Sequence, residues 1–74
     1  GRSEAMMGIS QREAEVLALV VKGFINKEIA DRLNISLTTV ITHRKNITDK
    51  LQLKSVSALT IYAVTHGIVS VDEI

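Results

Sequence analysis

The most extended amphipathic pattern in the chain covers residues 36–53. If this stretch is helical, with about 100° of turn per residue, its apolar side chains fall on one stripe. The members of that stripe are Val40, Ile47 and Leu51, flanked by Leu37 and the aliphatic stem of Arg44. The opposite side carries hydroxyl-bearing and charged side chains, namely Thr38, Thr42, Lys45 and Asp49, with Ile41, Asn46 and Gln52 beside them. The pattern therefore predicts a helix with one buried face and one polar face.

The polar face of this helix allows two interpretations. Hydroxyl and lysine side chains suit base edges and phosphates, and a helix of roughly 25 Å is long enough to lie in a DNA major groove about 12 Å wide. The same face would suit the solvent-exposed side of an ordinary bundle helix. This stretch alone does not separate the two, so its context in the chain matters.

A first helix is predicted over residues 10–22. Ser10 and Glu13 have the spacing of a capping box, in which each side chain accepts a hydrogen bond from the other residue's backbone amide. Gly23 supplies the left-handed residue that commonly ends a helix. The apolar face of this helix would consist of Val16, Leu17 and Val20.

A short second helix is predicted to follow almost at once. Asn26 is its candidate N-cap, and the apolar pattern ends at Leu33. Asn34 can adopt the left-handed conformation at the end of this helix, Ile35 can fold back onto its last turn, and Ser36 can cap the third helix. Two helices joined by so tight a turn, the second with a polar and basic face, have the layout of a helix-turn-helix unit.

The fourth predicted helix runs from residue 56 to about residue 66, with Ser55 opening it and Gly67 ending it. It is apolar on two sides, which is unusual in so small a domain. Val56, Leu59, Tyr62 and Ala63 form one face, and Ile61 and Val64, beside the small Ser57, form the other. We expect a second copy of the chain to cover this second face in a homodimer. The alternative is that the tail, residues 68–71, covers it.

The four predicted helices, together with the composition, favour an all-α fold class, a compact four-helix domain that contains the helix-turn-helix. Its 74 residues suffice for one domain, and the absence of proline and an aromatic content of 3% favour helices packed by aliphatic side chains. We expect the domain to span residues 9–74. Residues 1–8 lack periodicity and are expected to be a flexible lead-in or a remnant of cloning, on a piece excised from a larger protein.

The chain has the composition of a cytoplasmic protein with no membrane segment. It contains no cysteine, which excludes disulfides and cysteine-ligated zinc and is compatible with a reducing compartment. Its longest apolar run, residues 16–21, is too short to span a bilayer, and its first eight residues lack the apolar core of a signal peptide. A membrane partner is therefore not expected.

The net charge of +1 is small for a nucleic-acid-binding protein, but the positive charge is localised. Residues 1–36 contain five basic and five acidic side chains, whereas residues 37–54 contain four basic side chains and one acidic. Residues 55–74 contain only Asp72 and Glu73 as charged side chains. The excess of positive charge thus lies on the third helix and just after it, which favours DNA as the partner.

The sequence predicts neither an enzyme nor a cofactor. No phosphate-binding loop or metal-ligand spacing is present, and the two histidines lie on different predicted helices. We expect His43 to have a structural role, with its ring packed and hydrogen-bonded to nearby backbone. We expect His66 to be the last-turn cation that suits a helix C-terminus.

Matched positions along residues 9–69 identify a resemblance to the LuxR-type (NarL/GerE) helix-turn-helix domain of bacterial transcription regulators. They are Ile9, Ser10, Arg12, Glu13, Glu15–Leu17, Gly23, Asn26–Ala30, Leu33, Ser36, Thr39, Val40, His43, Ile47, Lys50, Leu51 and Gly67. The resemblance implies that the second helix braces the third, that the third binds DNA, and that the fourth pairs with its copy in a dimer. It also implies an N-terminal receiver or sensory domain, as in response regulators of two-component systems, and makes RNA polymerase a further candidate partner.

Two positions depart from the family pattern. Ile41 stands where the family often has a lysine that can contact DNA, so sequence preference should differ, although isoleucine can still touch a thymine methyl group. Val56 stands where the family often has an arginine, so a contact to the DNA backbone is expected to be missing or to pass to Lys54.

The predicted site divides into residues that contact bases and residues that contact phosphates. The base-facing set is Thr38, Ile41, Thr42 and Lys45. The phosphate set is Lys27, Thr39, Arg44, Asn46, Lys50 and Lys54. The competing function is a helical protein-interaction module that holds a polymerase subunit or another regulator; such a module would bind with little salt dependence and leave no footprint on DNA.

Overall fold

The computed structural model describes residues 8–74, so the lead-in predicted for residues 1–8 lies, except for Gly8, outside the described residues. Four α-helices and one 3-10 turn make up this part of the chain, which contains no strand. They are α2 (Gln11–Val21), α3 (Asn26–Leu33), α4 (Leu37–Leu51), α5 (Val56–Thr65) and η1 (Val71–Glu73). The all-α prediction is confirmed, and the predicted helix boundaries are correct to within about two residues.

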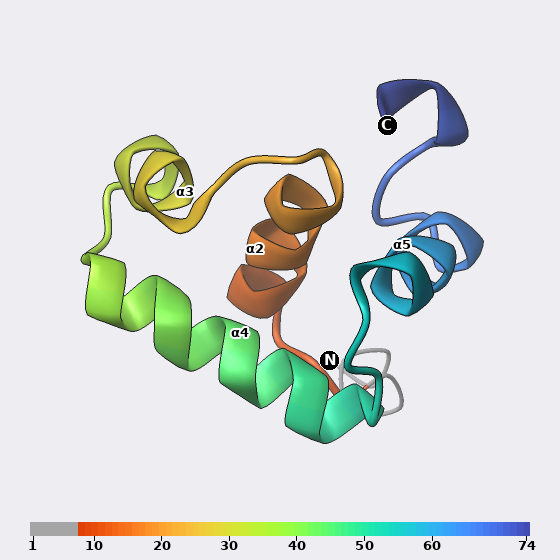
Figure 1. Cartoon of the computed structure of the whole chain (residues 1–74), viewed down its shortest axis with the longest axis horizontal. Coiled ribbons are helices and arrows are strands. Elements are labelled where there is room, and N and C mark those ends of the chain that lie inside the picture. Colours follow the sequence, from red (N-terminus) through yellow and green to blue (C-terminus); the bar gives the residue numbers. More distant parts are fainter. Residues whose placement is uncertain (1–7) are drawn as a thin grey trace.

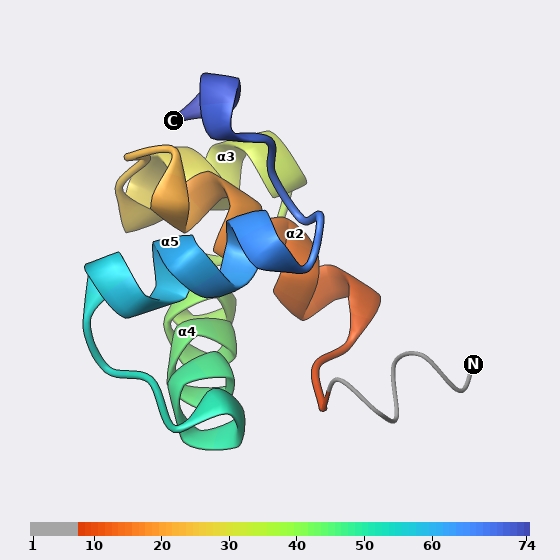
Figure 2. The ribbon, with the colours of Figure 1, turned by 90° about the vertical axis from the view of Figure 1, so that its right-hand side faces the viewer.

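The helix α2 lies at the centre of the arrangement. It packs against α3, α4 and α5, while α4 also packs against α3. Figure 1 shows α4 running along one side of the molecule, with α2 above its middle and with α3 and α5 on opposite sides of α2. Figure 2 shows that the C-terminal tail and η1 end on the side of the molecule away from α4. One long side of α4 is thus left free of other helices.

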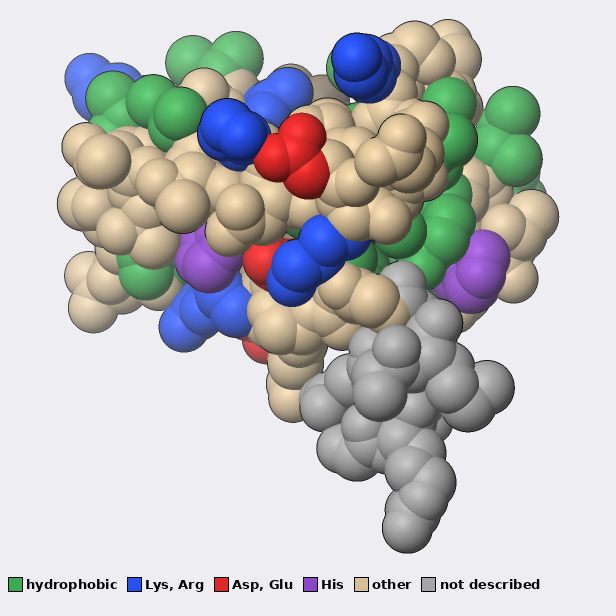
Figure 3. All heavy atoms as spheres, turned by 90° about the horizontal axis from the view of Figure 1, so that it is seen from below, with side chains coloured by type: hydrophobic (Ala, Val, Ile, Leu, Met, Phe, Trp, Pro, Cys, Tyr) green, Lys and Arg blue, Asp and Glu red, His purple; other side chains and the backbone are tan. Residues whose placement is uncertain are grey.

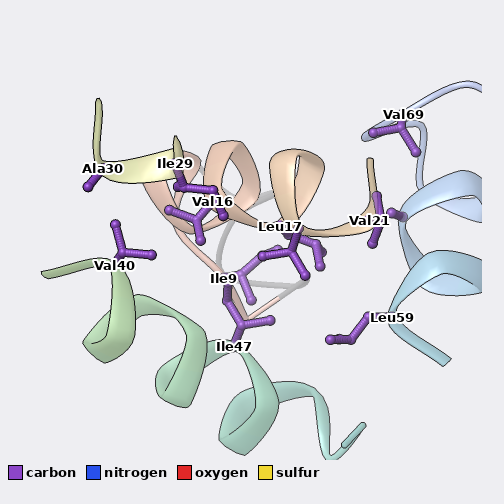
Figure 4. Packing of buried hydrophobic residues seen from close by; sticks show 12 residues of the cluster. Ile9, Val16, Leu17, Val21, Ile29, Ala30, Val40, Ile47, Leu59 and Val69 are labelled. Carbon is purple, nitrogen blue, oxygen red and sulfur yellow. The ribbon is translucent and has the colours of Figure 1, made fainter. Parts of the chain in front are cut away.

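The predicted apolar stripe of α4 is buried at Val40 and Ile47, and it faces α2. Val40 is 0% exposed and Ile47 is 2% exposed. Figure 4 shows both side chains directed toward the layer that contains Val16 and Leu17 of α2. The prediction for Leu37 is wrong, because this side chain is 49% exposed. The first buried residue of α4 is Val40, so packing begins only one turn after the helix starts.

The predicted helix ends are confirmed except at the start of α3. Ser10 Oγ accepts from the Glu13 amide at 3.1 Å, and Glu13 Oε1 accepts from the Ser10 amide at 2.9 Å. Gly23 has a φ of 97°, where a side chain would be strained. Asn26 is not the cap of α3: the cap is Ile25, whose amide donates to Glu28 Oε1 at 2.9 Å. Asn26 is the first helical residue, and its side chain is used in a contact with α4 described below.

The turn between α3 and α4 has the predicted geometry. Asn34 is left-handed, with a φ of 58°, and the Ile35 amide donates back to Ala30 O at 3.0 Å. Ser36 Oγ then accepts from the Thr39 amide at 3.1 Å and caps α4. These bonds satisfy groups that a helix end leaves free, so α3 and α4 are joined without a flexible linker. The helix-turn-helix is therefore present in the fold.

The helix α5 buries only part of its apolar surface. Leu59 and Ala63 are buried, Val64 is half-buried against the core, and Ile61 is 65% exposed. Val56, which was predicted to share an apolar face with Leu59 and Ala63, is 54% exposed, because it lies in the first turn, before the helix reaches the core. No helix within residues 8–74 has the length and apolar character needed to cross a membrane.

The tail after α5 returns to α2. Val69 is buried in the core, and Lys22 Nζ lies 3.3 Å from Glu73 Oε2, an ion pair that holds the tail near the C-terminal end of α2. The alternative that this tail covers the second apolar face of α5 is wrong for Ile61, which stays exposed.

A partly buried ion pair links the N-terminal end of α2 to α4. Lys50 Nζ donates to Glu13 Oε1 at 2.9 Å and to Glu13 Oε2 at 3.1 Å. Within residues 8–74, Glu13 is the single polar or charged residue that is buried, with an exposed fraction of 4%. Its carboxylate therefore caps α2 and holds α4 at the same time.

Opposing effects act on the pKa of Glu13. Burial alone raises this pKa, but the hydrogen bonds from Lys50 and from the Ser10 amide, with the positive charges of Lys50 and His43, outweigh burial and lower it below 4.5. Because this pKa is lower in the folded state, the charged carboxylate stabilises that state at pH values above the ordinary pKa of a glutamate. This stabilisation is lost as the pH falls through the lowered pKa.

We expect Glu13→Gln to reduce the free energy of unfolding at pH 7 by about 1–2 kcal/mol, between the values typical of exposed and buried pairs. The variant should also lose less stability than the parent when the pH is lowered through the acidic range, because one carboxyl that must be protonated is gone. Denaturant unfolding monitored by circular dichroism between pH 7 and pH 3 measures both effects. Glu15→Gln is the matched control, since Glu15 is an exposed partner of Arg12 on the same helix, and it should cost less than about 0.5 kcal/mol. Equal losses in the free energy of unfolding for the two variants would show that the Glu13–Lys50 pair does not stabilise the fold more than an exposed pair does.

Candidate nucleic-acid interface

The outer side of α4 is an exposed and mainly uncharged polar surface. Thr38, Thr42 and Lys45 are exposed, and Ile41 is 51% exposed, so the four residues predicted to face bases share one accessible side of the helix. Figure 3 looks onto the molecule from the side of α4 and shows a polar surface with a basic and an acidic side chain next to each other in its middle. The core on the opposite side of α4 fixes this orientation, because Val40 and Ile47 cannot turn outward without exposing apolar surface.

The single lysine of the base-facing set is paired with a carboxylate on its own helix. Lys45 Nζ lies 2.9 Å from Asp49 Oδ2, with the two side chains 75% and 63% exposed. The hydrogen bond and the charge of Asp49 raise the pKa of Lys45. The ammonium group is thus directed along the helix in the free protein.

Two cations of the predicted phosphate set are turned toward the protein. Arg44 Nη1 donates to Asn26 Oδ1 at 2.9 Å, which joins α4 to the first residue of α3. Lys50 donates to Glu13, as described above, which joins α4 to the start of α2. These two contacts fix α4 against both α3 and α2. The phosphate contacts expected of Arg44 and Lys50 stay predictions, and they would have to use donors that the internal contacts leave free.

The remaining members of the phosphate set lie at the margins of α4. Lys27 is exposed on the first turn of α3, and Lys54 is exposed in the segment after α4. Lys54 and Arg44 line a small cleft of 60 Å³ between α2, α4 and α5, so the structure brings these two cations near each other. Thr39 and Asn46 are half-buried, and Thr39 Oγ1 lies 2.8 Å from Ser36 Oγ at the helix cap.

The two histidines have structural surroundings. His43 is half-buried, but its Nδ1 finds no hydrogen-bond partner among residues 8–74, so the predicted bond to backbone is wrong. His66 caps α5, and its ring stacks on Tyr62 with the ring centroids 3.9 Å apart. Within the described residues, no cluster of histidine, aspartate and glutamate side chains could hold a metal ion.

The residues predicted for a dimer contact do not form a uniform exposed face. Ser57 and Ile61 are exposed, whereas Val64 is half-buried against the core. Ile61 is therefore the main apolar side chain that this face offers to a partner.

Sequence analysis missed the two long-range contacts of α4. Arg44 and Asn26 are 18 residues apart, and Lys50 and Glu13 are 37 residues apart, so no local pattern indicates either pair. The Lys45–Asp49 pair was accessible from sequence, since opposite charges four residues apart on a helix commonly meet.

Comparison with known proteins agrees with this architecture. The family described as "Bacterial regulatory proteins, luxR family" matches residues 7–63. The transcriptional regulatory protein MctR of Rhizobium johnstonii is 47% identical over 62 residues, which cover 84% of this chain and 29% of MctR. The response regulator protein VraR of Staphylococcus aureus is 38% identical over 68 residues, which cover 92% of this chain and 32% of VraR. No solved structure matches the chain.

The chain spans less than a third of the length of these curated relatives, since it covers 29% of MctR and 32% of VraR. The family match takes in all of α2, α3 and α4 and most of α5, so it covers the helix-turn-helix described above. The resemblance first identified from matched motif positions is thereby confirmed. The chain belongs to the luxR family of bacterial regulatory proteins, and its helix-turn-helix lies within the residues that match.

Proposed function

We propose that this chain binds double-stranded DNA sequence-specifically, as the effector domain of a transcription regulator, with α4 in the major groove. The observation that carries the proposal is the exposed outer side of α4, held outward by a buried inner stripe. A helix in the major groove reads sequence through the side chains that reach base edges. We take residues 9–74 as the domain that performs this function.

Base contacts would come from the exposed stripe of α4. Lys45 is suited to the O6 and N7 acceptors of guanine, Thr38 and Thr42 to several bases, and Ile41 to a thymine methyl group. All four are accessible in the free protein. Binding at this stripe therefore requires no rearrangement of the core.

Phosphate contacts would flank this stripe. Lys27 and Lys54 are exposed, and Lys27 lies beside the free amides at the start of α3, which favour anions. Arg44 has five donors and gives one to Asn26, while Lys50 has three and gives two to Glu13. Both can thus hold α4 in place and still offer a donor to DNA. Thr39 and Asn46 complete the set as neutral donors at the edge of the helix.

We further propose that two copies pair through α5, with Ile61 at the centre of the contact and with Ser57 and Val64 beside it. The support is the 65% exposure of Ile61 on a helix whose other face is buried. A two-fold arrangement would place two α4 helices about one turn of DNA apart, roughly 34–36 Å, on related half-sites.

The rest of the protein would supply regulation. VraR is called a response regulator, and the chain covers 32% of it, which leaves room for a receiver or sensory domain in a protein of that size. We propose such a domain as a covalent partner and RNA polymerase as a candidate target of the assembled regulator.

DNA binding by this chain should depend strongly on salt. Each neutralised phosphate should contribute a slope of about −0.9 to log K against log[salt], so a few contacts give a steep dependence. Fluorescence anisotropy on a duplex selected from random sequences, over a series of salt concentrations, measures the slope. A flat response would overturn the proposal and favour the alternative of a protein-interaction module.

Lys45→Ala and Lys54→Ala should have different effects. The first should weaken binding to the selected duplex by about ten-fold or more and relax the preference at one base position, because it removes a base contact. The second should weaken binding to all duplexes similarly and make the salt slope shallower by about one. Binding titrations of both variants on selected and scrambled duplexes separate the roles. Identical ratios of selected to scrambled affinity would show that the roles are wrongly divided.

Ile61→Glu should leave the fold and the binding of one half-site nearly unchanged, because Ile61 is exposed in the single chain. It should abolish cooperative binding to a site with two half-sites, since pairing would bury an unpaired charge. Circular dichroism and gel shifts on one and two half-sites test this expectation. Unfolding of the variant would place Ile61 in the core, and unchanged cooperativity would place the dimer contact elsewhere.

A further inference from the structure

A negative charge stands in the middle of the surface that we propose to face DNA. Asp49 follows Thr38, Thr42 and Lys45 along α4 at steps of three and four residues, which places all four side chains on one side of the helix. The carboxylate is 63% exposed. An acidic side chain lies directly beside a basic one on this surface in Figure 3. No core packing requires a carboxylate at this position.

A carboxylate at this position opposes most complexes with DNA. An ionised carboxylate can only accept hydrogen bonds, so backbone phosphates and the acceptors guanine O6, guanine N7 and thymine O4 cannot bond to it. Among base edges, only the amino groups of cytosine and adenine can donate to it. Binding that depends on phosphates alone, which all sequences support, therefore gains nothing from Asp49 and is weakened by its charge. A complex offsets the unfavourable effect of this charge only if it also makes a favourable base contact close to Asp49.

The same carboxylate controls the one lysine of the base-facing set. The distance of 2.9 Å between Lys45 Nζ and Asp49 Oδ2 directs the ammonium along the helix axis. While this pair persists, Lys45 is neutralised within the protein and adds little to non-specific attraction. The lysine must leave Asp49 to reach a base, so its contribution is conditional on what the DNA offers.

We propose that Asp49 is a specificity-determining residue, which holds Lys45 along α4 and releases it only where the major groove presents acceptors that bind the ammonium better, such as guanine O6 and N7. This inference rests on the DNA-binding function proposed above. Asp49 acts through Lys45 and lowers the affinity for sites that cannot engage that lysine. Its expected effect is on the ratio of specific to non-specific affinity rather than on specific affinity itself.

The test is Asp49→Asn, which keeps the shape of the side chain and removes its charge. We would measure the affinity of the whole chain for a duplex selected by the parent and for a scrambled duplex of the same length and composition, at several salt concentrations. The variant should bind the scrambled duplex more tightly than the parent does, with a smaller gain on the selected duplex. From the usual strength of an exposed pair, the ratio of the two affinities should fall about two- to five-fold.

Glu15→Gln is the matched control. Glu15 is also an exposed carboxylate that pairs with a cation on its own helix, Arg12 at 3.2 Å, but it lies on α2. This variant changes the net charge by the same amount. It should raise the affinity for both duplexes by the same small factor and leave their ratio unchanged.

A double variant tests whether Asp49 acts through Lys45. In a Lys45→Ala background, Asp49→Asn should no longer change the ratio of selected to scrambled affinity. The same fall in ratio with and without Lys45 would overturn the proposal, as would an unchanged ratio in the single variant. If the parent chain itself shows no salt-dependent preference for the selected duplex, the DNA-binding function fails; if the parent shows it and Asp49→Asn retains the ratio, only this inference fails.

Discussion

Burial of one stripe of α4 against α2 is the constraint on which the rest of this structure depends. Val40 and Ile47 are almost completely removed from solvent, and each such side chain contributes about 1.5–3 kcal/mol relative to exposure. A domain of this size buries only about 60% of the surface of its unfolded chain, so these contributions are a large part of a small total. The rotation of α4 about its own axis is therefore fixed by the core. The identity of its outward residues follows from that rotation.

Polar contacts refine the position that the apolar core establishes. Lys50 joins α4 to Glu13 at the capped start of α2, and Arg44 joins α4 to Asn26 at the start of α3. The cap at Ser36 and the left-handed Asn34 hold the turn between α3 and α4. Because these bonds join α4 to the starts of α2 and α3 and fix the turn before it, the proposed recognition helix is held on rigid elements. A base-reading surface needs this rigidity, since a hydrogen bond to a base edge tolerates little displacement.

The basic side chains of residues 37–54 divide into those that fix α4 within the fold and those that are free to bind a partner. Arg44 and Lys50 have internal acceptors, Lys45 has an acceptor on its own helix, and Lys54 lies in the open segment after α4. The excess of positive charge in residues 37–54 is thus less available than a count of lysines and arginines implies. This division is consistent with a surface that binds DNA through a small number of selective contacts. Attraction by net charge alone would be weak in a chain whose formal charge is +1.

Local sequence patterns were enough to predict the helices, the turn between α3 and α4, and the two faces of α4. Each depends on residues within about seven positions of one another: the capping box of Ser10 and Glu13, the left-handed Asn34, and the helical spacing of Val40 and Ile47. The family followed from the same local motifs. The sequence also placed the candidate base contacts correctly on the exposed side of α4, because helical periodicity separates that side from the buried stripe.

The polar contacts between helices could not be predicted from local patterns, because they depend on how the helices pack. The pairs Arg44–Asn26 and Lys50–Glu13 join residues 18 and 37 positions apart, so they depend on how the helices pack and leave no periodic signal. The same holds for the exposure of Leu37 and Val56, since apolar residues in a first turn are buried only if a neighbouring element extends to them. Asn26 shows the contrast most clearly. Its local pattern predicts a helix cap, but packing places Arg44 beside its side chain, and the cap passes to the backbone of Ile25.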